Sequence, residues 1–175
     1  MKTSIKITTA LFATLSIFSC KNVETDATAT DADEITVEET ATDMASLEFN
    51  NEATKEMFQH YVHIKTALVN SDLDEAKSGA QMLIKASTNE EVTNALTAIA
   101  TANDIETQRT AFSTLTTTLT PIIENDITSG EIYQQFCPMA FNNAGGYWLS
   151  KEEEIRNPYY GDRMLKCGRV AQTIK

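Results

Sequence analysis

Apolar residues recur at intervals of three and four from residue 51 to residue 119, and no other feature of the chain constrains its fold as strongly. This spacing lays apolar side chains along one face of a helix. Four segments carry it, with apolar positions Ala53, Met57, Tyr61, Ile64 and Leu68; then Leu73, Ala76, Ala80, Leu83 and Ile84; then Val92, Ala95, Leu96 and Ile99; and finally Ala111, Phe112, Leu115 and Leu119. The sequence therefore predicts four amphipathic helices.

Capping signals place the ends of these helices. We expect the first helix to begin after Asn51 and to stop near Asn70, and the fourth to begin near Ile105. Two pairs have the spacing of a capping box and predict the starts of the second and third helices, namely Ser71 with Asp74 and Thr88 with Glu91. Pro121 is expected to end or kink the fourth helix.

Short connections between the four segments favour antiparallel neighbours. We therefore predict a mainly α protein, an antiparallel four-helix bundle that carries a small, loop-rich C-terminal cap with short β strands. Strands are expected at 131–136, which alternates in polarity, and at 169–174. Between them, the sequence predicts turns at Gly145-Gly146 and Asn157-Pro158, and a helix start at Ser150 with Glu153. Residues 47–175 are expected to form this single domain.

The first twenty residues have the composition of a secretory signal. Lys2 and Lys6 precede an apolar stretch over 7–18 that is too short to span a bilayer. The stretch ends in Ser19 and Cys20 and resembles the lipobox of bacterial lipoproteins, although Phe18 departs from the smaller residue usual there. We predict a signal peptide over 1–19 and lipidation of Cys20; the alternative is ordinary cleavage beside a cysteine that carries no lipid.

Residues 20–46 contain eight carboxylates and no apolar period, so they are predicted to form an acidic, disordered tether behind the lipidated cysteine. The expected location is the bacterial cell envelope, on the outer membrane or its periplasmic face, with the membrane bound only through the lipid anchor. The formal charge of the whole chain is −11. Because binding to a phosphate backbone depends on clustered Lys and Arg, nucleic acid is excluded as a partner.

Sulfur-bearing residues near the C-terminus are the main candidates for chemistry. Each of two cysteines has a methionine close by in the sequence, in Cys137-Pro138-Met139 and in Met164-Leu165-Lys166-Cys167. Thiolates and thioethers together form a soft ligand set that favours a monovalent ion such as Cu(I) or Ag(I). We therefore predict a metal site of Cys137, Met139, Met164 and Cys167, with His60 and His63 as weaker candidates.

A disulfide between Cys137 and Cys167 is the principal alternative, because a secreted chain enters an oxidising compartment. It would close a loop of about 30 residues and stabilise the fold by roughly 3.5 to 4 kcal/mol in the chain-entropy model. A disulfide and a two-thiolate metal site exclude each other. In that case the two methionines would serve as core residues.

The C-terminal motifs resemble a secreted bacterial domain of unknown function. The resemblance covers roughly residues 56–174 and is carried by Tyr61 to Ala80, Phe136-Cys137-Pro138-Met139-Ala140, Gly146-Tyr147-Trp148-Leu149-Ser150, Ile155-Arg156-Asn157-Pro158-Tyr159-Tyr160-Gly161 and Met164-Leu165-Lys166-Cys167-Gly168. That family occurs alone in lipoproteins and fused to the C-terminus of periplasmic adaptor subunits of copper and silver efflux systems. The resemblance implies heavy-metal efflux components as partners.

The Cys-Pro-Met triplet also resembles that of short heavy-metal-binding domains, in which a histidine follows the methionine. Ala140 stands at that position here, so the resemblance does not carry that site over. The sequence has no Gly-x-Ser-x-Gly elbow, phosphate-binding loop, His-Glu-x-x-His or Cys-x-x-Cys motif. We therefore expect a binding protein or a non-catalytic adaptor module, and no enzyme.

Overall fold

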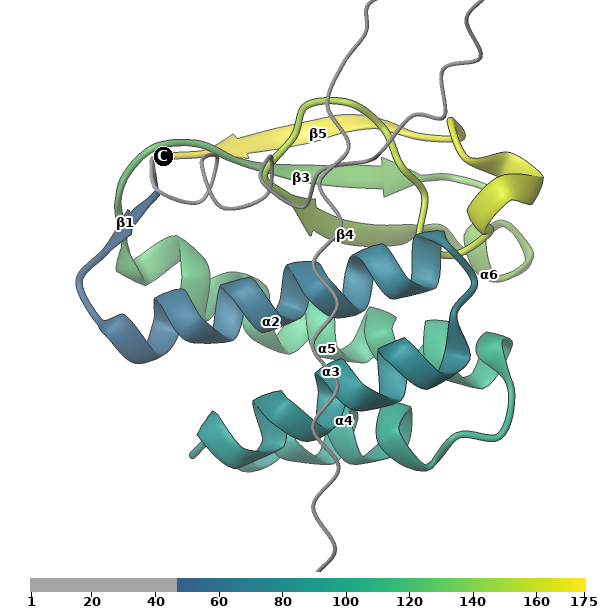
Figure 1. The fold of residues 1–175 in the computed structure, drawn as a ribbon. Helices are drawn as coiled ribbons and strands as arrows, with labels where there is room; N and C mark the ends of the chain where they lie inside the picture. Colours follow the sequence, from purple (N-terminus) through teal and green to yellow (C-terminus); the bar gives the residue numbers. More distant parts are fainter. Residues whose placement is uncertain (1–46) are drawn as a thin grey trace, which may run out of the picture. The chain divides into compact units, whose positions relative to one another are not determined.

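The computed structural model describes residues 47–175. This part of the chain is mostly helical, with small antiparallel sheets formed largely by its C-terminal third, as the sequence predicts. In chain order the elements are β1 (Glu48–Phe49), α2 (Glu52–Val69), α3 (Leu73–Ala86), α4 (Glu90–Thr101), α5 (Ile105–Asp126), β2 (Ile127–Ser129), β3 (Ile132–Cys137), α6 (Ala140–Asn143), β4 (Gly146–Ser150), η1 (Gly161–Met164) and β5 (Arg169–Ile174) (Figure 1). The predicted signal peptide, Cys20 and the acidic segment lie outside the described residues.

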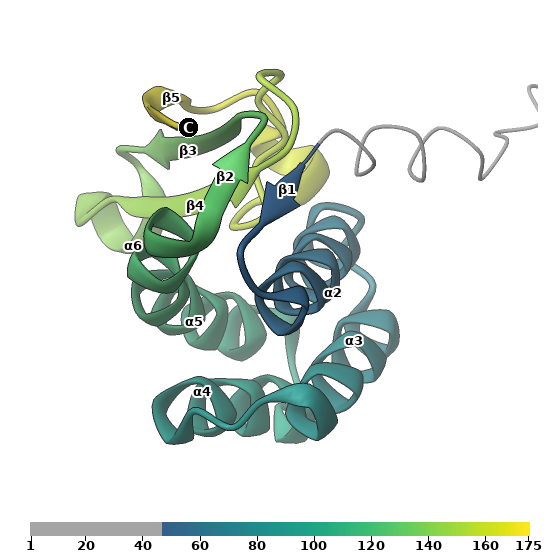
Figure 2. The ribbon, with the colours of Figure 1, turned by 90° about the vertical axis from the view of Figure 1, so that its left-hand side faces the viewer.

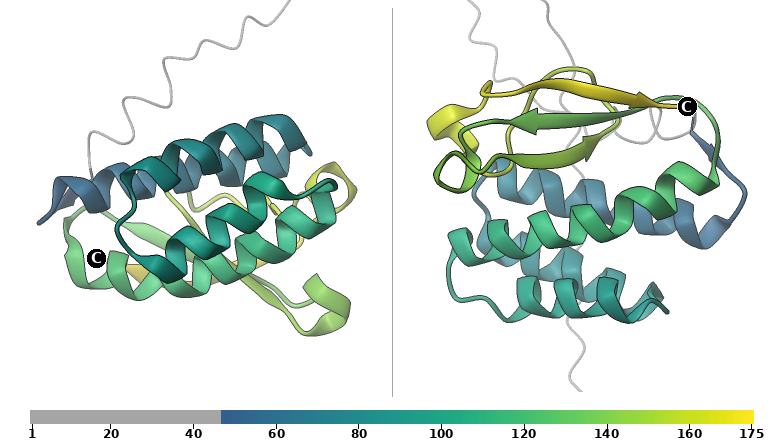
Figure 3. Two further views of the ribbon diagram at one scale, coloured as in Figure 1. Left: turned by 90° about the horizontal axis from the view of Figure 1, so that it is seen from below. Right: turned by 180° about the vertical axis from the view of Figure 1, so that it is seen from behind.

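The described elements are arranged in layers. A three-stranded antiparallel sheet of order β4-β3-β5 lies on one side, and α2 and α5 lie between it and the pair α3 and α4 (Figures 1 and 2). A second, two-stranded sheet pairs β1 with β2, which join the start of α2 to the end of α5. The views from below and behind show the same order (Figure 3). None of the helices in this part of the chain is long and apolar enough to cross a membrane.

Three predicted helix boundaries hold and three are wrong. Asn51 caps α2 by accepting a hydrogen bond from the backbone N–H of Ala53, α2 stops at Asn70, and α5 begins at Ile105. The second helix is capped by Asp72 and the third by Asn89, each one residue beyond the predicted cap, because these side chains accept the free N–H groups of Glu75 and Val92. Pro121 does not end α5, because the helix continues to Asp126; the alternative, a kink at Pro121, stays a prediction.

The buried face of α2 is also shifted from the predicted stripe. Tyr61, Ile64 and Leu68 are fully buried as expected, but Ala53 is exposed and Phe58 takes the core position expected for Met57. The physical reason is that α2 packs against α3 on one side and against α5 and the sheet on the other. Because α2 is in contact on two sides, the buried part of its surface is wider than the single apolar stripe predicted from the sequence.

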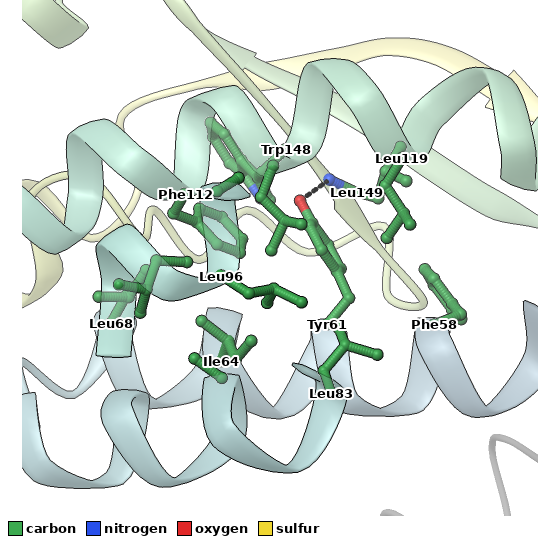
Figure 4. Packing of buried hydrophobic residues seen from close by; sticks show 14 of the residues in the cluster. Phe58, Tyr61, Ile64, Leu68, Leu83, Leu96, Phe112, Leu119, Trp148 and Leu149 are labelled. Carbon is green, nitrogen blue, oxygen red and sulfur yellow. Dashed lines mark hydrogen bonds between the residues drawn. The ribbon is translucent and has the colours of Figure 1, made fainter. Parts of the chain in front are cut away.

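Tyr61 joins the helices to the sheet at the centre of the core. Its ring stacks on Phe112 of α5 with the ring centroids 4.8 Å apart, and its hydroxyl lies 2.7 Å from Thr116 Oγ1. The same hydroxyl accepts the backbone N–H of Leu149 in β4 at 3.0 Å (Figure 4). Trp148 is buried beside it and meets Tyr159 edge to face. Tyr159 also meets Phe112 of α5, with the ring centroids 6.3 Å apart, so these two aromatic residues pack the C-terminal segment against the helices.

Arg109 makes a second connection between the helices and the C-terminal segment. Its side chain is buried and donates to the carbonyl oxygen of Pro158 at 2.8 Å, to that of Leu68 at 3.2 Å and to Ser71 Oγ at 3.0 Å. It also forms an ion pair of 2.9 Å with Glu106. One guanidinium thus holds the end of α2, the start of α5 and the 157–161 turn together.

Candidate functional site

The two C-terminal cysteines meet at one end of the three-stranded sheet. Cys137 ends β3 and Cys167 lies just before β5, whose first residue pairs with Phe136. The two Sγ atoms lie 3.0 Å apart, and both residues are free thiols in the structure. Cys137 is 0% exposed, whereas Cys167 is partly exposed. The sheet therefore brings two soft donors into direct contact across 30 residues of sequence.

The contact with Cys137 shifts the pKa of Cys167. The hydrogen bond with Cys137 is the largest cause that raises the pKa of Cys167, and partial burial and repulsion from the neighbouring sulfur add to it. The backbone N–H of Met139 donates to the Cys167 sulfur and acts in the opposite direction. Because the net pKa is raised, Cys167 is protonated at neutral pH, and a metal ion that binds it must displace a proton.

The turn at 157–161 positions both cysteine-bearing segments. The buried Asn157 side chain donates to the carbonyl oxygen of Cys167 and accepts the backbone N–H of Tyr159, both at 2.8 Å. The Tyr160 hydroxyl donates to the carbonyl oxygen of Met139 at 2.7 Å. The predicted Asn157-Pro158 turn is confirmed. The turn also holds the two cysteine-bearing segments in place through these hydrogen bonds, which residue spacing in the sequence does not predict.

The hairpin after Cys137 has an uncommon backbone. Phe141, Asn142 and Asn143 have φ values of 52°, 56° and 68°, and Gly145 follows at 85°. Left-handed backbone is costly for a bulky residue such as Phe141 and needs surrounding contacts to maintain it. Here the Phe141 ring packs edge to face on Tyr159, whose hydroxyl donates to the carbonyl oxygen of Tyr147. The tertiary structure therefore imposes this conformation next to the cysteines.

The backbones of all four predicted sulfur residues lie at one corner of the sheet. The amide of Met139 contacts the Cys167 sulfur, and the backbone N–H of Cys167 donates to the carbonyl oxygen of Met164 at 3.0 Å. Met139 is 45% exposed, so it does not fill the core. Met164 ends the short helix η1 and is half-buried.

The two histidines are held elsewhere, on α2. His60 Nε2 lies 3.8 Å from Glu56, and His63 Nε2 lies 2.6 Å from Glu75 of α3. Each imidazole therefore faces a different carboxylate. Between residues 47 and 175, no group of three or more His, Cys, Asp or Glu side chains is arranged to hold a metal ion.

A buried charge cluster beneath the end of β4 was not predicted from the sequence. The Lys65 amine lies 3.2 Å from both Ser150 Oγ and a Glu152 carboxylate oxygen, and Ser150 Oγ also donates to Glu152. The expected helix start at Ser150 and Glu153 is wrong, because Ser150 ends β4 in register with Tyr133. The only available signal was a lysine on the apolar face of a predicted helix.

The same cluster shifts the pKa values of Lys65 and Glu152. Burial lowers the pKa of Lys65, although Glu152 opposes this effect. Partial burial acts to raise the pKa of Glu152, but the charge of Lys65 and the hydrogen bonds from Ser150 and Lys65 hold it below its usual value. A carboxylate whose pKa is lowered by folding stabilises the fold above the unfolded-state pKa of about 4.3, and this contribution is lost as the pH falls through the folded-state value.

We expect Glu152→Gln to destabilise the protein by about 1 to 3 kcal/mol at pH 7, because it leaves the buried Lys65 amine without its charged partner. The cost is discounted from that of a fully buried pair, since the Glu152 side chain is 38% exposed. Urea unfolding should show the difference from the unsubstituted protein shrink below about pH 4.5. Glu153→Gln, at the exposed neighbour, is the control and should change little; equal effects of the two substitutions would contradict the assignment.

Comparison with known proteins gives one match. Residues 57–130 match a family model described as "Protein of unknown function (DUF3347)". These residues include most of α2 and all of α3, α4, α5 and β2, so this part of the chain forms a domain of unknown function. Neither a curated protein nor a solved structure matches the chain. The match ends before Cys137, so it carries no information about the cysteine pair.

Proposed function

We propose that the chain is a bacterial envelope lipoprotein that binds a soft, monovalent metal ion such as Cu(I) or Ag(I) between Cys137 and Cys167. The observation that carries the proposal is the 3.0 Å contact between the two thiol sulfurs at one end of the three-stranded sheet. Two thiolates are soft donors, and soft ions bind them in preference to oxygen ligands. The partial exposure of Cys167 gives an ion a way in from solvent.

The ligand set argues for an ion of low coordination number. Structural zinc sites take four ligands in a tetrahedron, whereas the described residues offer no third His, Cys, Asp or Glu ligand at this corner. Met139 and Met164, which flank the pair in the backbone, are proposed as supplementary thioether donors. His60 and His63 are left out of the site, because each already faces a carboxylate.

The cellular setting is part of the proposal. Lipid on Cys20 would anchor the chain to the membrane in the envelope, on the outer membrane or its periplasmic face, and the acidic segment over 20–46 would separate the domain from that surface. The resemblance described above points to heavy-metal efflux components as partners, in metal homeostasis or export. No reaction is assigned to the chain.

A second candidate is a non-catalytic adaptor module that keeps a Cys137–Cys167 disulfide and acts through protein contacts. The same sulfur contact favours it, together with the Asn157 and Tyr160 hydrogen bonds that hold the two segments in place. For the helical part, we retain the antiparallel four-helix bundle as a proposal. It is supported by the succession of contacts from α2 to α3, α3 to α4, α4 to α5 and α5 back to α2.

Titration with Ag(I) separates the two candidates. Thiols are first counted in protein isolated from the envelope with and without reductant, and the reduced full chain is then titrated with Ag(I). We expect about one equivalent to bind, and Cys137→Ser or Cys167→Ser to weaken binding by more than the 10- to 100-fold typical of losing a residue outside the ligand set. Zn(II) at the same concentration should not displace Ag(I).

The methionines are tested in the same titration. Met139→Leu and Met164→Leu should each weaken Ag(I) binding while the unfolding midpoint changes little, because leucine conserves size and apolarity. Met82→Leu on α3 is the matched control. Unchanged affinity in both variants would remove the methionines from the site, and absence of Ag(I) binding to the reduced protein would overturn the metal proposal.

A further inference from the structure

We infer that Cys137 and Cys167 form a reversible thiol–disulfide pair. Cys167 is the thiol that reacts first with an oxidant, and Cys137 is the resolving thiol that then forms the internal disulfide. Oxidation therefore prevents metal binding at this site. The part of this inference that concerns metal rests on the proposed function. The exchange chemistry itself rests only on the placement of the two sulfurs.

The first argument is distance. A disulfide requires the two sulfurs to lie about 2.05 Å apart, so the 3.0 Å contact needs a movement of about 1 Å to close. A bound ion needs the opposite movement, since two metal–thiolate bonds of about 2.3 Å, the length known for zinc, separate the sulfurs further when they lie on opposite sides of the ion. The dithiol therefore lies between two mutually exclusive states.

The second argument is access. Cys137 has no exposed surface and is enclosed at the end of β3, whereas Cys167 is partly exposed. An oxidant from solvent meets Cys167 first. The Asn157 side chain holds the carbonyl of Cys167, and Tyr160 holds the carbonyl of Met139 beside Cys137. These hydrogen bonds keep the second thiol within reach of the first after the exposed sulfur has reacted.

The chemistry needs an external oxidant, and a small-molecule disulfide, R–S–S–R, supplies it. Cys167 first loses its proton, and its sulfur then attacks one sulfur of R–S–S–R, forms a mixed disulfide and releases one R–S⁻. The Cys137 thiolate then attacks the Cys167 sulfur and releases the second R–S⁻. Two electrons pass from the cysteine pair to the oxidant, and the two thiol protons leave with the two molecules of R–SH. Excess R–SH reverses both steps.

Exchange with glutathione tests the order of attack. The full chain and its Cys137→Ser and Cys167→Ser variants are incubated with oxidised glutathione while folded, and peptide mass spectrometry separates these positions from Cys20. We expect Cys137→Ser to retain glutathione on Cys167, and Cys167→Ser to react at Cys137 at least about tenfold more slowly. The unsubstituted pair should form the internal disulfide. Equal reactivity at the two positions, or no internal disulfide, would overturn the inference.

Ag(I) binding measured across a series of reduced-to-oxidised glutathione ratios tests the closure of the site. Bound Ag(I) should fall in proportion to the fraction of internal disulfide and return when excess reduced glutathione is added and then removed. If the fully oxidised protein bound Ag(I) as well as the reduced protein does, the inference that oxidation prevents metal binding would be wrong. If the reduced protein binds no Ag(I) while the exchange proceeds in the expected order, the proposed function fails and the thiol–disulfide pair stands.

Discussion

Replacing Arg109 with methionine should lower the free energy of unfolding by about 3 to 5 kcal/mol, the range expected when one partner of a buried charged network is removed. Methionine retains much of the side-chain volume but donates no hydrogen bond. The carbonyl oxygens of Leu68 and Pro158 would lose their buried donor. Urea unfolding of the full chain measures the change.

Arg163→Met is the matched control for this prediction. Both arginines pair with the same oxygen of Glu106, but the Arg163 side chain is 62% exposed and that of Arg109 only 2%. Exposed ion pairs contribute about 1 kcal/mol or less, so the control should be nearly neutral. Similar losses in the two variants would mean that the shared ion pair, and not the buried carbonyl contacts, stabilises the fold.

The second large effect is expected for Gln135→Glu, which changes one atom of a buried side chain. Gln135 Nε2 donates to three consecutive carbonyl oxygens, those of Glu152, Glu153 and Glu154, at 2.9, 3.0 and 3.2 Å. A carboxylate at that position would turn an acceptor toward three acceptors. We expect a loss of about 3 kcal/mol or more at pH 7, because a buried charge without a donor is costly.

This loss should depend on pH in a defined direction. The carbonyl groups and burial would raise the folded-state pKa of the new carboxyl above its unfolded value of about 4.3. The penalty is then smallest below that value, where the protonated carboxyl can donate one hydrogen bond in place of those from the amide, and it grows as the pH rises. Unfolding of variant and unsubstituted protein is compared at pH 7 and pH 4, with the exposed Gln81→Glu on α3 as the control. A loss that is equal at both pH values would contradict the proposed role of the amide.

The structure also shows how the two cysteine-bearing segments are held together. Asn157, Tyr159 and Tyr160 connect the hairpin after Cys137 to the segment that carries Cys167. Arg109 in turn ties the same turn to the helices through Pro158. The cysteine pair is therefore coupled to the helical layer by a short series of hydrogen bonds, of which the one from Arg109 to Pro158 is buried. Substitutions at the turn should disturb the pair even where they do not contact sulfur.

Elements whose evidence is local could be predicted from the sequence. The period of apolar residues identified α2, α3, α4 and α5, and the alternating run identified β3 with β5 as its partner. It also singled out Cys137 and Cys167, because two cysteines with methionines close by are visible without a fold. Cap positions were wrong by one residue at Asp72 and Asn89, since neighbouring polar residues compete for the same N–H groups and spacing alone does not decide between them.

Tertiary structure decided what depends on contacts between distant segments. Strand β4 was missed, because its backbone pairs with β3 while its sequence, with Ser150 before a run of glutamates, carries a local helix signal. The burial of Lys65 and Arg109 could not be predicted either, because their partners lie 87 and 49 residues away at Glu152 and Pro158. Cys137 and Cys167 were expected to meet, but the place where they do so, at the end of the sheet, is set by the pairing of β3 with β5. Local patterns specify which residues form an element, whereas only the packed sheet determines which side chains meet across it.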